Sequence, residues 1–174
     1  MLDMAPYYLN VMISLFGAVD SVYSMQKKTF AQRTIKVEPH RGDKIDVEIP
    51  THVCATLSFK NGVIGTFTNS FDIWGSQTPN IEIYREKGTM ILPNPNMFTG
   101  PVLVRRYGDK EWRQYTQFVE YEGYGRGIGV MDMIKSIEKN KAHKASAELA
   151  YHVTDIILTM DEAAEAKREL NTNS

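Results

Sequence analysis

Near the start of the chain, apolar residues recur at the spacing of an α-helix. The pattern predicts a helix over about Asp3 to Phe16, with Asp3 as the N-cap, because a carboxylate can accept a bond from a free backbone N–H. Pro6 is tolerated in a first turn, and Gly17 suits the end of the helix. One face of this helix is apolar and consists of Leu9, Met12, Ile13 and Phe16.

The middle of the chain, from about Ala18 to Glu120, alternates apolar and polar residues with the period of β-strands. The clearest hairpin runs from His52 to Ser70, because Asn61-Gly62 is a strong hairpin-turn signal between two strand-like runs. If the loop has two residues, Lys60 pairs with Val63, Leu57 with Thr66 and Ala55 with Thr68. Further predicted strands are Thr34–Val37, Ile45–Ile49, Ile81–Tyr84, Thr89–Leu92 and Val102–Val104.

The two faces of this hairpin differ in character. The face expected to meet the helices carries Val53, Ala55, Leu57, Phe59 and Ile64. The other face carries His52, Cys54, Thr56, Phe67, Asn69 and Phe71. Two interpretations stay open for this second face: a subunit interface, or a solvated face with scattered apolar residues, which are normal on protein surfaces.

The chain closes with two predicted helices and a polar tail. Ser146 is placed to cap the second helix, and Asn171–Ser174 is expected to fray. The order of helix, many strands and then helices predicts one α+β domain over residues 1–174. Its sheet is expected to be open and predominantly antiparallel or mixed, with helices packed on one face. The apolar residues of the two helices are Val130, Met133, Ile134 and Ile137, then Leu149, Val153, Ile156, Ile157, Met160 and Ala164.

Composition and charge narrow the function classes. At 43% hydrophobic and 24% charged residues, the 174-residue chain is typical of a globular protein. A net charge of −1 offers no footprint for nucleic acid or an anionic membrane, and no apolar run reaches the roughly 20 residues of a membrane span. Cys54 is the sole cysteine, which excludes a disulfide within one chain. Without a signal-peptide pattern, a cytoplasmic location is the default expectation.

A glycine-rich stretch, Gly123–Gly129, precedes the first closing helix and superficially looks like a phosphate loop. Its glycines occupy alternate positions, so no register matches G-x-G-x-x-G, and a flexible entry to the helix is the preferred interpretation. Arg126 within it could present a cation to an anionic or polyhydroxyl ligand.

Two further sets of polar residues are candidates for chemistry. Asp3 and Tyr7 are four residues apart, so a helix would place both on one face as an acid–base or substrate-orienting pair. The other interpretation makes Asp3 a cap and Tyr7 a packed ring. His152 follows Glu148 by one turn, and a buried or ion-paired histidine is the usual explanation. The spacing of the histidines predicts no metal site.

Five segments in order resemble the C-terminal domain of the Gfo/Idh/MocA family, the glucose–fructose oxidoreductase and inositol dehydrogenase group. The first is similar to the family's D-x-G-x-H-Y-L helix start, and the third to its strand pair I-E-I-Y-G-x-x-G-T-L. The second is similar to its central hairpin, and the last two to its closing helices. The segments are Leu2–Leu9, Leu57–Phe67, Ile81–Met90, Arg126–Met133 and Ala145–Val153.

The resemblance implies a glyceraldehyde-3-phosphate dehydrogenase-like C-terminal domain from an NAD(P)-dependent oxidoreductase. Its substrate would be a sugar, cyclitol or related hydroxyl compound, and its subunits would pair as a homo-oligomer through the open sheet face. The family's N-terminal Rossmann domain, with its NAD or NADP site, and its E-K-P lysine are absent from this sequence. We therefore expect the chain alone to bind no cofactor and to be inactive.

The resemblance also implies site residues. Tyr7 aligns with the family's helix histidine and Asp3 with its aspartate, which makes them the catalytic candidates. Trp74, Arg126 and His152 are the candidates for substrate binding. Phenols ionise well above neutral pH, so a tyrosine is a poorer base than imidazole. The alternative hypothesis is a non-catalytic binding or regulatory module that retains the sheet domain.

Overall fold

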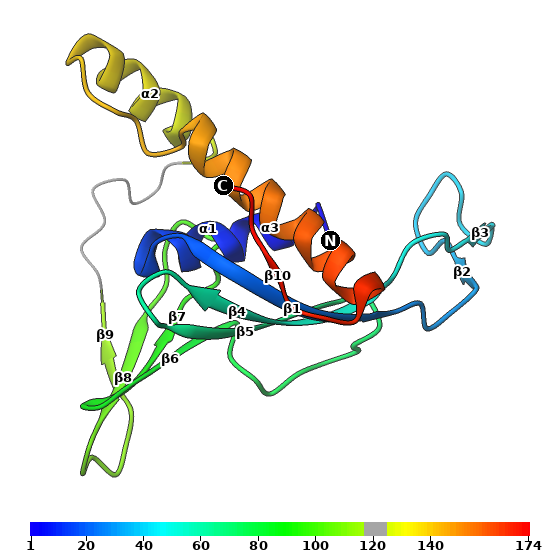
Figure 1. Ribbon diagram of the computed structural model, residues 1–174, viewed down its shortest axis with the longest axis horizontal. Coiled ribbons are helices and arrows are strands. Elements are labelled where there is room, and N and C mark those ends of the chain that lie inside the picture. The colour runs from blue at the N-terminus through cyan, green and yellow to red at the C-terminus, as the bar shows by residue number, and fades with distance from the viewer. Residues whose placement is uncertain (117–124) are drawn as a thin grey trace. The chain divides into compact units, whose positions relative to one another are not determined.

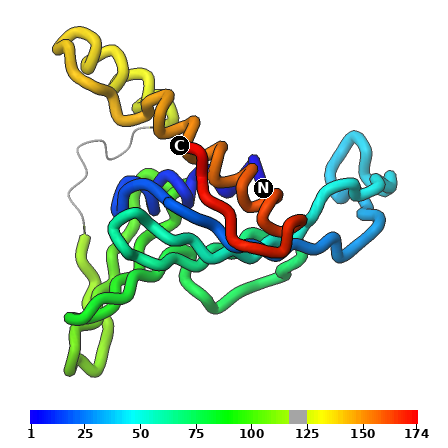
Figure 2. Tube along the Cα trace, viewed as in Figure 1, coloured from blue at the N-terminus to red at the C-terminus, as the bar shows by residue number. Residues whose placement is uncertain are grey.

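The computed structural model describes residues 1–116 and 125–174 (Figures 1 and 2). The chain divides into two compact units: unit 1 contains Met1–Trp74 and Tyr151–Ser174, and unit 2 contains Gly75–Ala150. Both are α+β, and every strand pair is antiparallel among the described residues, as the sequence pattern predicts. Gly123, Tyr124 and the predicted strand region beyond residue 116 lie outside this part of the chain.

Helix α1 (Ala5–Phe16) opens unit 1, and its N-terminus corrects one prediction. Met4 is the N-cap residue and makes no side-chain cap bond, so the assignment of Asp3 as the cap is wrong. A backbone turn satisfies the first helical N–H instead, because the Ala5 N–H donates to the Met1 carbonyl at 3.1 Å. At the other end, Gly17 has φ +82° and its N–H donates to the Ile13 carbonyl at 2.8 Å, as predicted.

The main sheet of unit 1 has the strand order β10-β1-β4-β5. Its strands are β1 (Val19–Lys27), β4 (His52–Phe59), β5 (Ile64–Ser70) and β10 (Leu170–Asn171). Helix α1 and the unit 1 part of α3 (Ala147–Ala166) lie on the same side of this sheet (Figure 1). The core between them is made of Leu9, Val19, Val22, Leu57, Phe59, Phe67, Val153, Ile156, Ile157 and Met160.

The hairpin between β4 and β5 forms, but in a different register from the predicted one. Ala55 pairs with Phe67, because the loop consists of Lys60, Asn61 and Gly62 and not of a two-residue turn. The Gly62 N–H donates to the Phe59 carbonyl at 2.8 Å, and Gly62 has φ +85°. This matches the alternative hairpin loop in which a left-handed glycine follows a turn. The two-residue loop and its pairings are therefore wrong.

A shift of one residue moves every side chain of a strand to the opposite face. Phe67 is only 7% exposed and joins the core beside Ala55, whereas Ile64 is 74% exposed on the other side. The face assignments of Ile64, Phe67 and Asn69 are corrected accordingly. We call the helix-free side the open face; it carries Tyr23, Met25, His52, Cys54, Thr56, Ile64, Thr66 and Thr68.

The polar tail of the chain is an ordered part of unit 1, so the expectation that it frays is wrong. Leu170 and Asn171 pair with β1 as strand β10, and the Thr172 hydroxyl donates to the Val19 carbonyl at 2.9 Å. The reason is non-local. The edge of β1 offers backbone groups that need partners, and a short polar segment can supply them.

Unit 1 also contains a small two-stranded sheet, formed by the segment between β1 and β4. Its strands are β2 (Gln32–Thr34) and β3 (Lys44–Asp46). The predicted strand Thr34–Val37 overlaps β2 only at Thr34, and the predicted strand Ile45–Ile49 overlaps β3 only at Ile45 and Asp46, so both predictions are wrong in their bounds. The Arg33 guanidinium donates to the Asp72 carboxylate, which also accepts from the Thr51 hydroxyl at 2.7 Å. These bonds hold the pKa of Asp72 below its usual value, with the Thr29 and Thr51 bonds as the leading causes, and they tie this hairpin to the end of β5.

Unit 2 contains a second four-stranded sheet, ordered β6-β7-β8-β9, and helix α2 (Ile128–Glu138). Its strands are β6 (Ile81–Arg85), β7 (Gly88–Leu92), β8 (Val102–Arg106) and β9 (Arg113–Tyr115), the last of which was not predicted. Gly88 has φ +150°, and a Cβ there would lie 2.4 Å from the Arg105 carbonyl oxygen. The predicted Lys87-Gly88 turn therefore needs glycine both for its backbone and for the approach of β8.

Candidate functional site

Asp3 and Tyr7 lie at the same end of α1. Tyr7 is half-buried in the first turns, and its N–H donates to the Met4 carbonyl at 3.3 Å. Asp3 is exposed in the turn that precedes the helix. A phenol hydroxyl can donate or accept a hydrogen bond, and a carboxylate can only accept. Each of the two groups by itself has the chemistry to hydrogen-bond a ligand hydroxyl group.

His152 is buried on α3, at 7% exposure, and both its ring nitrogens have partners inside unit 1. The Val19 N–H donates to Nε2 at 3.0 Å, which places the proton on Nδ1, where the Ser174 hydroxyl accepts it. Burial lowers the pKa of His152, Lys60 adds to this, and Asp155 opposes it. The arrangement makes His152 a neutral structural clasp and gives no support to its prediction as a substrate-binding residue.

Asp155 completes this clasp from one turn along the helix. Its carboxylate accepts from the Ser174 hydroxyl and the Asn173 N–H, both at 2.7 Å. Burial raises the pKa of Asp155, but these bonds outweigh burial and the pKa is lowered overall. Serine, histidine and aspartate meet here, yet Ser174 lies between the other two and the histidine Nε2 is used by the backbone. The cluster therefore anchors the tail and does not form a nucleophile.

Trp74 and Arg126 belong to different units. Trp74 is 91% exposed at the end of unit 1, and the Lys36 ammonium lies 4.9 Å from its ring centroid. Arg126 is exposed in unit 2, where its guanidinium donates to the Asn96 side-chain oxygen at 3.3 Å. Both side chains present polar or flat surfaces to solvent, and their prediction as substrate-binding residues stays a prediction.

A histidine–cysteine pair lies on the open face of unit 1. The His52 Nδ1 is 2.8 Å from the Ser70 hydroxyl, and its Nε2 is 3.3 Å from the Cys54 sulfur. Their i, i+2 spacing on a strand is the sequence signal, and it placed both residues on one face. Within the described part of the chain, no group of three His, Cys, Asp or Glu side chains could hold a metal ion.

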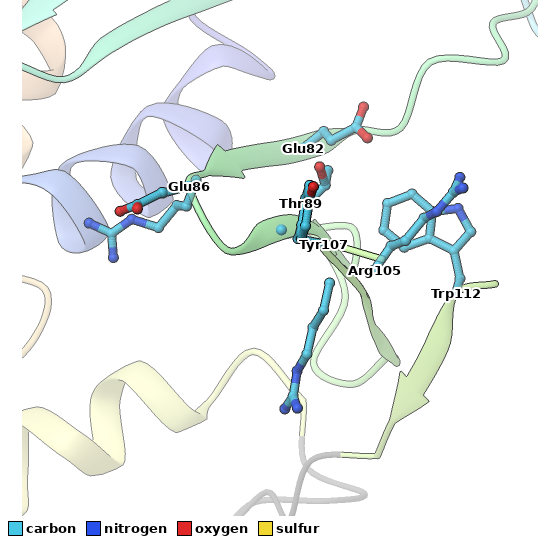
Figure 3. Close-up of a pocket in the computed structure, with 9 residues that line it drawn as sticks. Glu82, Glu86, Thr89, Arg105, Tyr107 and Trp112 are labelled. Carbon is cyan, nitrogen blue, oxygen red and sulfur yellow. The ribbon is translucent and has the colours of Figure 1, made fainter. Parts of the chain in front are cut away.

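Unit 2 carries an open groove of about 460 Å³, which the sequence did not reveal (Figure 3). It lies where β6, β7 and β8 approach the loop before β9. Glu82, one of its lining residues, accepts a bond at 2.9 Å from the hydroxyl of Tyr84, which is not itself a lining residue, and this bond raises the pKa of Tyr84. The lining residues come from several strands, so the sequence could reveal the groove only if the pairing of these strands were already known. They are Glu82, Arg85, Glu86, Gly88, Thr89, Arg105, Arg106, Tyr107 and Trp112.

No helix in the described ranges is long and apolar enough to cross a membrane. The chain matches the family model of the GFO/IDH/MocA C-terminal domain over residues 1–91. No curated protein matches the chain.

Solved structures share its fold. Levoglucosan dehydrogenase in its apo form has 17% identity and a TM-score of 0.78, with 99% of this chain and 50% of that chain covered. An NAD binding oxidoreductase from Klebsiella pneumoniae has 17% identity, a TM-score of 0.76 and the same coverage. Aldose-aldose oxidoreductase from Caulobacter crescentus, complexed with glycerol, has 13% identity and a TM-score of 0.69, with 97% and 46% covered. The chain thus spans about half the length of these structures.

Proposed function

Because this chain belongs to the GFO/IDH/MocA family, whose C-terminal domain it matches, we propose that it forms the substrate-side and oligomerisation part of an NAD(P)-dependent oxidoreductase. The substrate is a sugar, a cyclitol or a related hydroxyl compound. The observation that carries the proposal is the fold, because nearly the whole chain superposes on half of levoglucosan dehydrogenase, whose structures include complexes with NADH. One such structure holds NADH and levoglucosan, and another NADH and L-sorbose.

The nicotinamide does not fit the residues described here. Dinucleotides bind at the crevice of parallel βαβ units, and every described ladder of this chain is antiparallel. In the proposal, a domain outside these residues holds the cofactor and supplies hydride transfer. Calorimetric titration of the chain with NADH or NADPH should therefore show no specific binding. A dissociation constant on the order of micromolar would contradict this division of labour.

The proposed site residues are Tyr7 and Asp3. The Tyr7 hydroxyl hydrogen-bonds the reacting substrate hydroxyl, and the Asp3 carboxylate accepts a bond from a neighbouring one. Both groups lie at one end of α1, which fixes the backbone of Tyr7 through its bond to Met4. Trp74 and Arg126 are secondary candidates for contact with the substrate. His152 is not included, because its two nitrogens are already used.

The test is a Tyr7→Phe variant of the protein that carries this chain and its cofactor domain. Removal of a group that transfers or orients a proton typically costs 10²–10⁴-fold in rate, so kcat/KM should fall on that order with a panel of sugars and cyclitols. Tyr8→Phe is the matched control, since it removes the neighbouring half-buried phenol of the same helix. Unchanged kcat/KM in Tyr7→Phe would remove Tyr7 from the site. Ligand binding without turnover in the parent protein would favour a non-catalytic module.

The open face of unit 1 is the proposed oligomer interface. Tyr23, Met25 and Ile64 are 43%, 66% and 74% exposed there, among threonines and the His52–Cys54 pair. A standard interface buries roughly 800 Å² per partner, and a sheet face free of helices can supply such an area. A second copy of this chain is the proposed occupant, because both copies present the same mixed surface.

Sedimentation of the chain at micromolar concentration should show a dimer or a larger species. Met25→Lys places a charge on the open face and should shift the protein toward monomer. Leu158→Lys is the control, because Leu158 is an apolar residue of α3 that is 52% exposed. A monomeric parent chain, or equal behaviour of the two variants, would contradict the proposed interface.

A further inference from the structure

The register of the unit 2 sheet aligns four side chains in one row across the strands. Tyr84 of β6 pairs with Thr89 of β7, and Thr89 pairs with Arg105 of β8. Trp112 immediately precedes β9 and continues the row, because the ladder of β8 with β9 brings Arg113 opposite Val104. In Figure 3, Arg105 lies beside Trp112, with Thr89 and Glu82 next to it.

The row has aromatic rings at both ends and hydrogen-bonding groups between them. Tyr84 is 74% exposed and Trp112 37%, so each ring has a surface available for contact. The Thr89 hydroxyl can donate and accept, and the Arg105 guanidinium donates from several N–H groups. Glu82 lies on the same face, two residues before Tyr84, and supplies an acceptor.

Contacts within the sheet hold these groups in place before any ligand arrives. The Arg105 Nε donates to the Asp109 carbonyl at 3.2 Å, which restrains the guanidinium. Asp109 is itself fixed, since its carboxylate accepts from Arg113 at 3.0 Å. The Tyr84 hydroxyl is tied to Glu82 at 2.9 Å. Such preorganisation lowers the entropic cost of binding.

Charge and size then select the class of ligand. Within the row, the charges of Arg105 and Glu82 are opposite in sign and balance each other. Strand alternation turns Arg85 and Arg106 away from the row, and together with Glu86 they border the groove at the hairpin end. Three inter-strand steps of about 4.8 Å give the row a length of roughly 14 Å. Flat rings separated by neutral hydrogen-bonding groups suit a chain of polyhydroxylated rings, because its apolar ring faces can stack while its hydroxyls bond.

We propose that this row, made of Tyr84, Thr89, Arg105 and Trp112 with Glu82 beside it, binds a neutral oligosaccharide of two or three sugar rings. The terminal rings of the saccharide stack on Tyr84 and Trp112. Its central hydroxyls bond to Thr89, Arg105 and Glu82. The site lies within unit 2 and does not depend on the oxidoreductase function proposed for the family domain.

Trp112 provides the signal for the test. The chain has two tryptophans, so in a Trp74→Phe background Trp112 alone reports by fluorescence. Titration with maltotriose and with cellotriose should give a saturable change for at least one, with a dissociation constant on the order of millimolar or tighter. Glucose should bind at least about tenfold more weakly, because one ring cannot span both aromatics.

Variants in the same background locate the site. Tyr84→Ala and Arg105→Gln should each weaken trisaccharide binding by about tenfold. Tyr115→Ala is the matched control, since Tyr115 is 42% exposed but pairs with Val102 and so faces the opposite side. Circular dichroism checks that each variant keeps the parent fold, and only folded variants are compared.

Several results would overturn the proposal. One is the absence of a saturable change with both trisaccharides. Equal weakening by Tyr115→Ala would place the ligand elsewhere. Tighter binding of trigalacturonate than of either neutral trisaccharide would identify an anion site. If Tyr84→Ala converts an oligomer to monomer in sedimentation without saccharide, the row is an interface between copies of the chain.

Discussion

The two faces of the unit 1 sheet are built from alternate residues of the same strands, yet they have opposite fates. On the face covered by helices, Leu57 and Val22 are fully enclosed, and Phe67 is 7% exposed. On the open face, Tyr23 and Met25, the neighbours of Val22 and Ser24, are 43% and 66% exposed. Both faces contain large apolar side chains. The comparison teaches that register decides which residues become core, and composition alone does not.

The largest expected effect comes from placing an aspartate on one face or the other, at two adjacent positions of β5. Phe67→Asp removes a core ring, which costs about 3–5 kcal/mol, and also buries a carboxylate without a partner. We expect the variant not to fold. Thr66→Asp, one residue away on the open face, should remain folded. Urea denaturation followed by circular dichroism checks both. A stable Phe67→Asp variant together with an unfolded Thr66→Asp variant would instead support the register predicted from a two-residue loop.

The next largest effect is expected from loss of the Asp155 clasp, which fastens the C-terminal tail beside the edge strand of the covered face. Asp155→Ala leaves the Ser174 hydroxyl and the Asn173 N–H without their acceptor, at a cost of about 1–3 kcal/mol. Amide exchange of Thr172, whose N–H donates to Asp20, should accelerate. Glu162→Ala on the exposed side of α3 serves as the control. Unaltered exchange at Thr172 would show that β10 holds without the clasp.

Acidification should lower the free energy of unfolding through His152, which lies on helix α3 above the covered face. Burial lowers the pKa of His152 in the folded state, whereas the unfolded side chain titrates near its ordinary value of 6.5. As pH falls below that value, the unfolded state takes up the proton first, so the free energy of unfolding decreases. This loss continues down to the folded pKa.

His152→Gln isolates this contribution, because the side-chain carbonyl oxygen of glutamine can still accept a bond from the Val19 N–H, whereas glutamine does not titrate. Urea midpoints near pH 7 and near pH 5 should fall less in this variant than in the parent. The other histidines remain in both proteins and cancel in the difference. Equal falls would show that His152 does not carry the pH dependence.

The smallest expected effect concerns Gly65, where helix α1 approaches the covered face. A Cβ at this position would lie 2.8 Å from the Met12 Cε and 3.3 Å from a ring carbon of Phe59. Since the methionine end is flexible, Gly65→Ala should cost only about 1 kcal/mol. Met12→Ala in the same chain should relieve part of that cost. A double-mutant cycle by urea denaturation measures the coupling, and zero coupling would contradict the close approach.

Much of the fold followed from local patterns. Helical spacing predicted α1 and the apolar stripe of α3, and Ser146 caps α3 as expected, with its hydroxyl accepting the Leu149 N–H at 3.2 Å. Asn61-Gly62 predicted the central hairpin, and five short motifs predicted the family that the comparisons identify. These features depend on residues close together in the chain, where propensity and turn chemistry act directly.

For the candidate site, the sequence by itself determined which residues to test and little of their surroundings. The resemblance selected Tyr7 and Asp3, but the first turn of α1 placed Asp3 outside the helix. His152 was selected as a ligand-binding residue, whereas the fold engages it with Val19 and Ser174. The sequence separation of these partners is too large for any local pattern to reveal.

Tertiary structure alone decided three further features: the register of β5, the docking of the tail and the row in unit 2. The extra loop residue at Lys60–Gly62 turned Phe67 into the core and Ile64 out of it. The open edge of β1 recruited Leu170 and Asn171, and the pairing of β6 to β9 brought Tyr84, Thr89 and Arg105 together. Elements follow from local propensity, but their alignment minimises the free energy of all contacts at once. A one-residue shift changes every cross-strand partner while leaving the local pattern untouched.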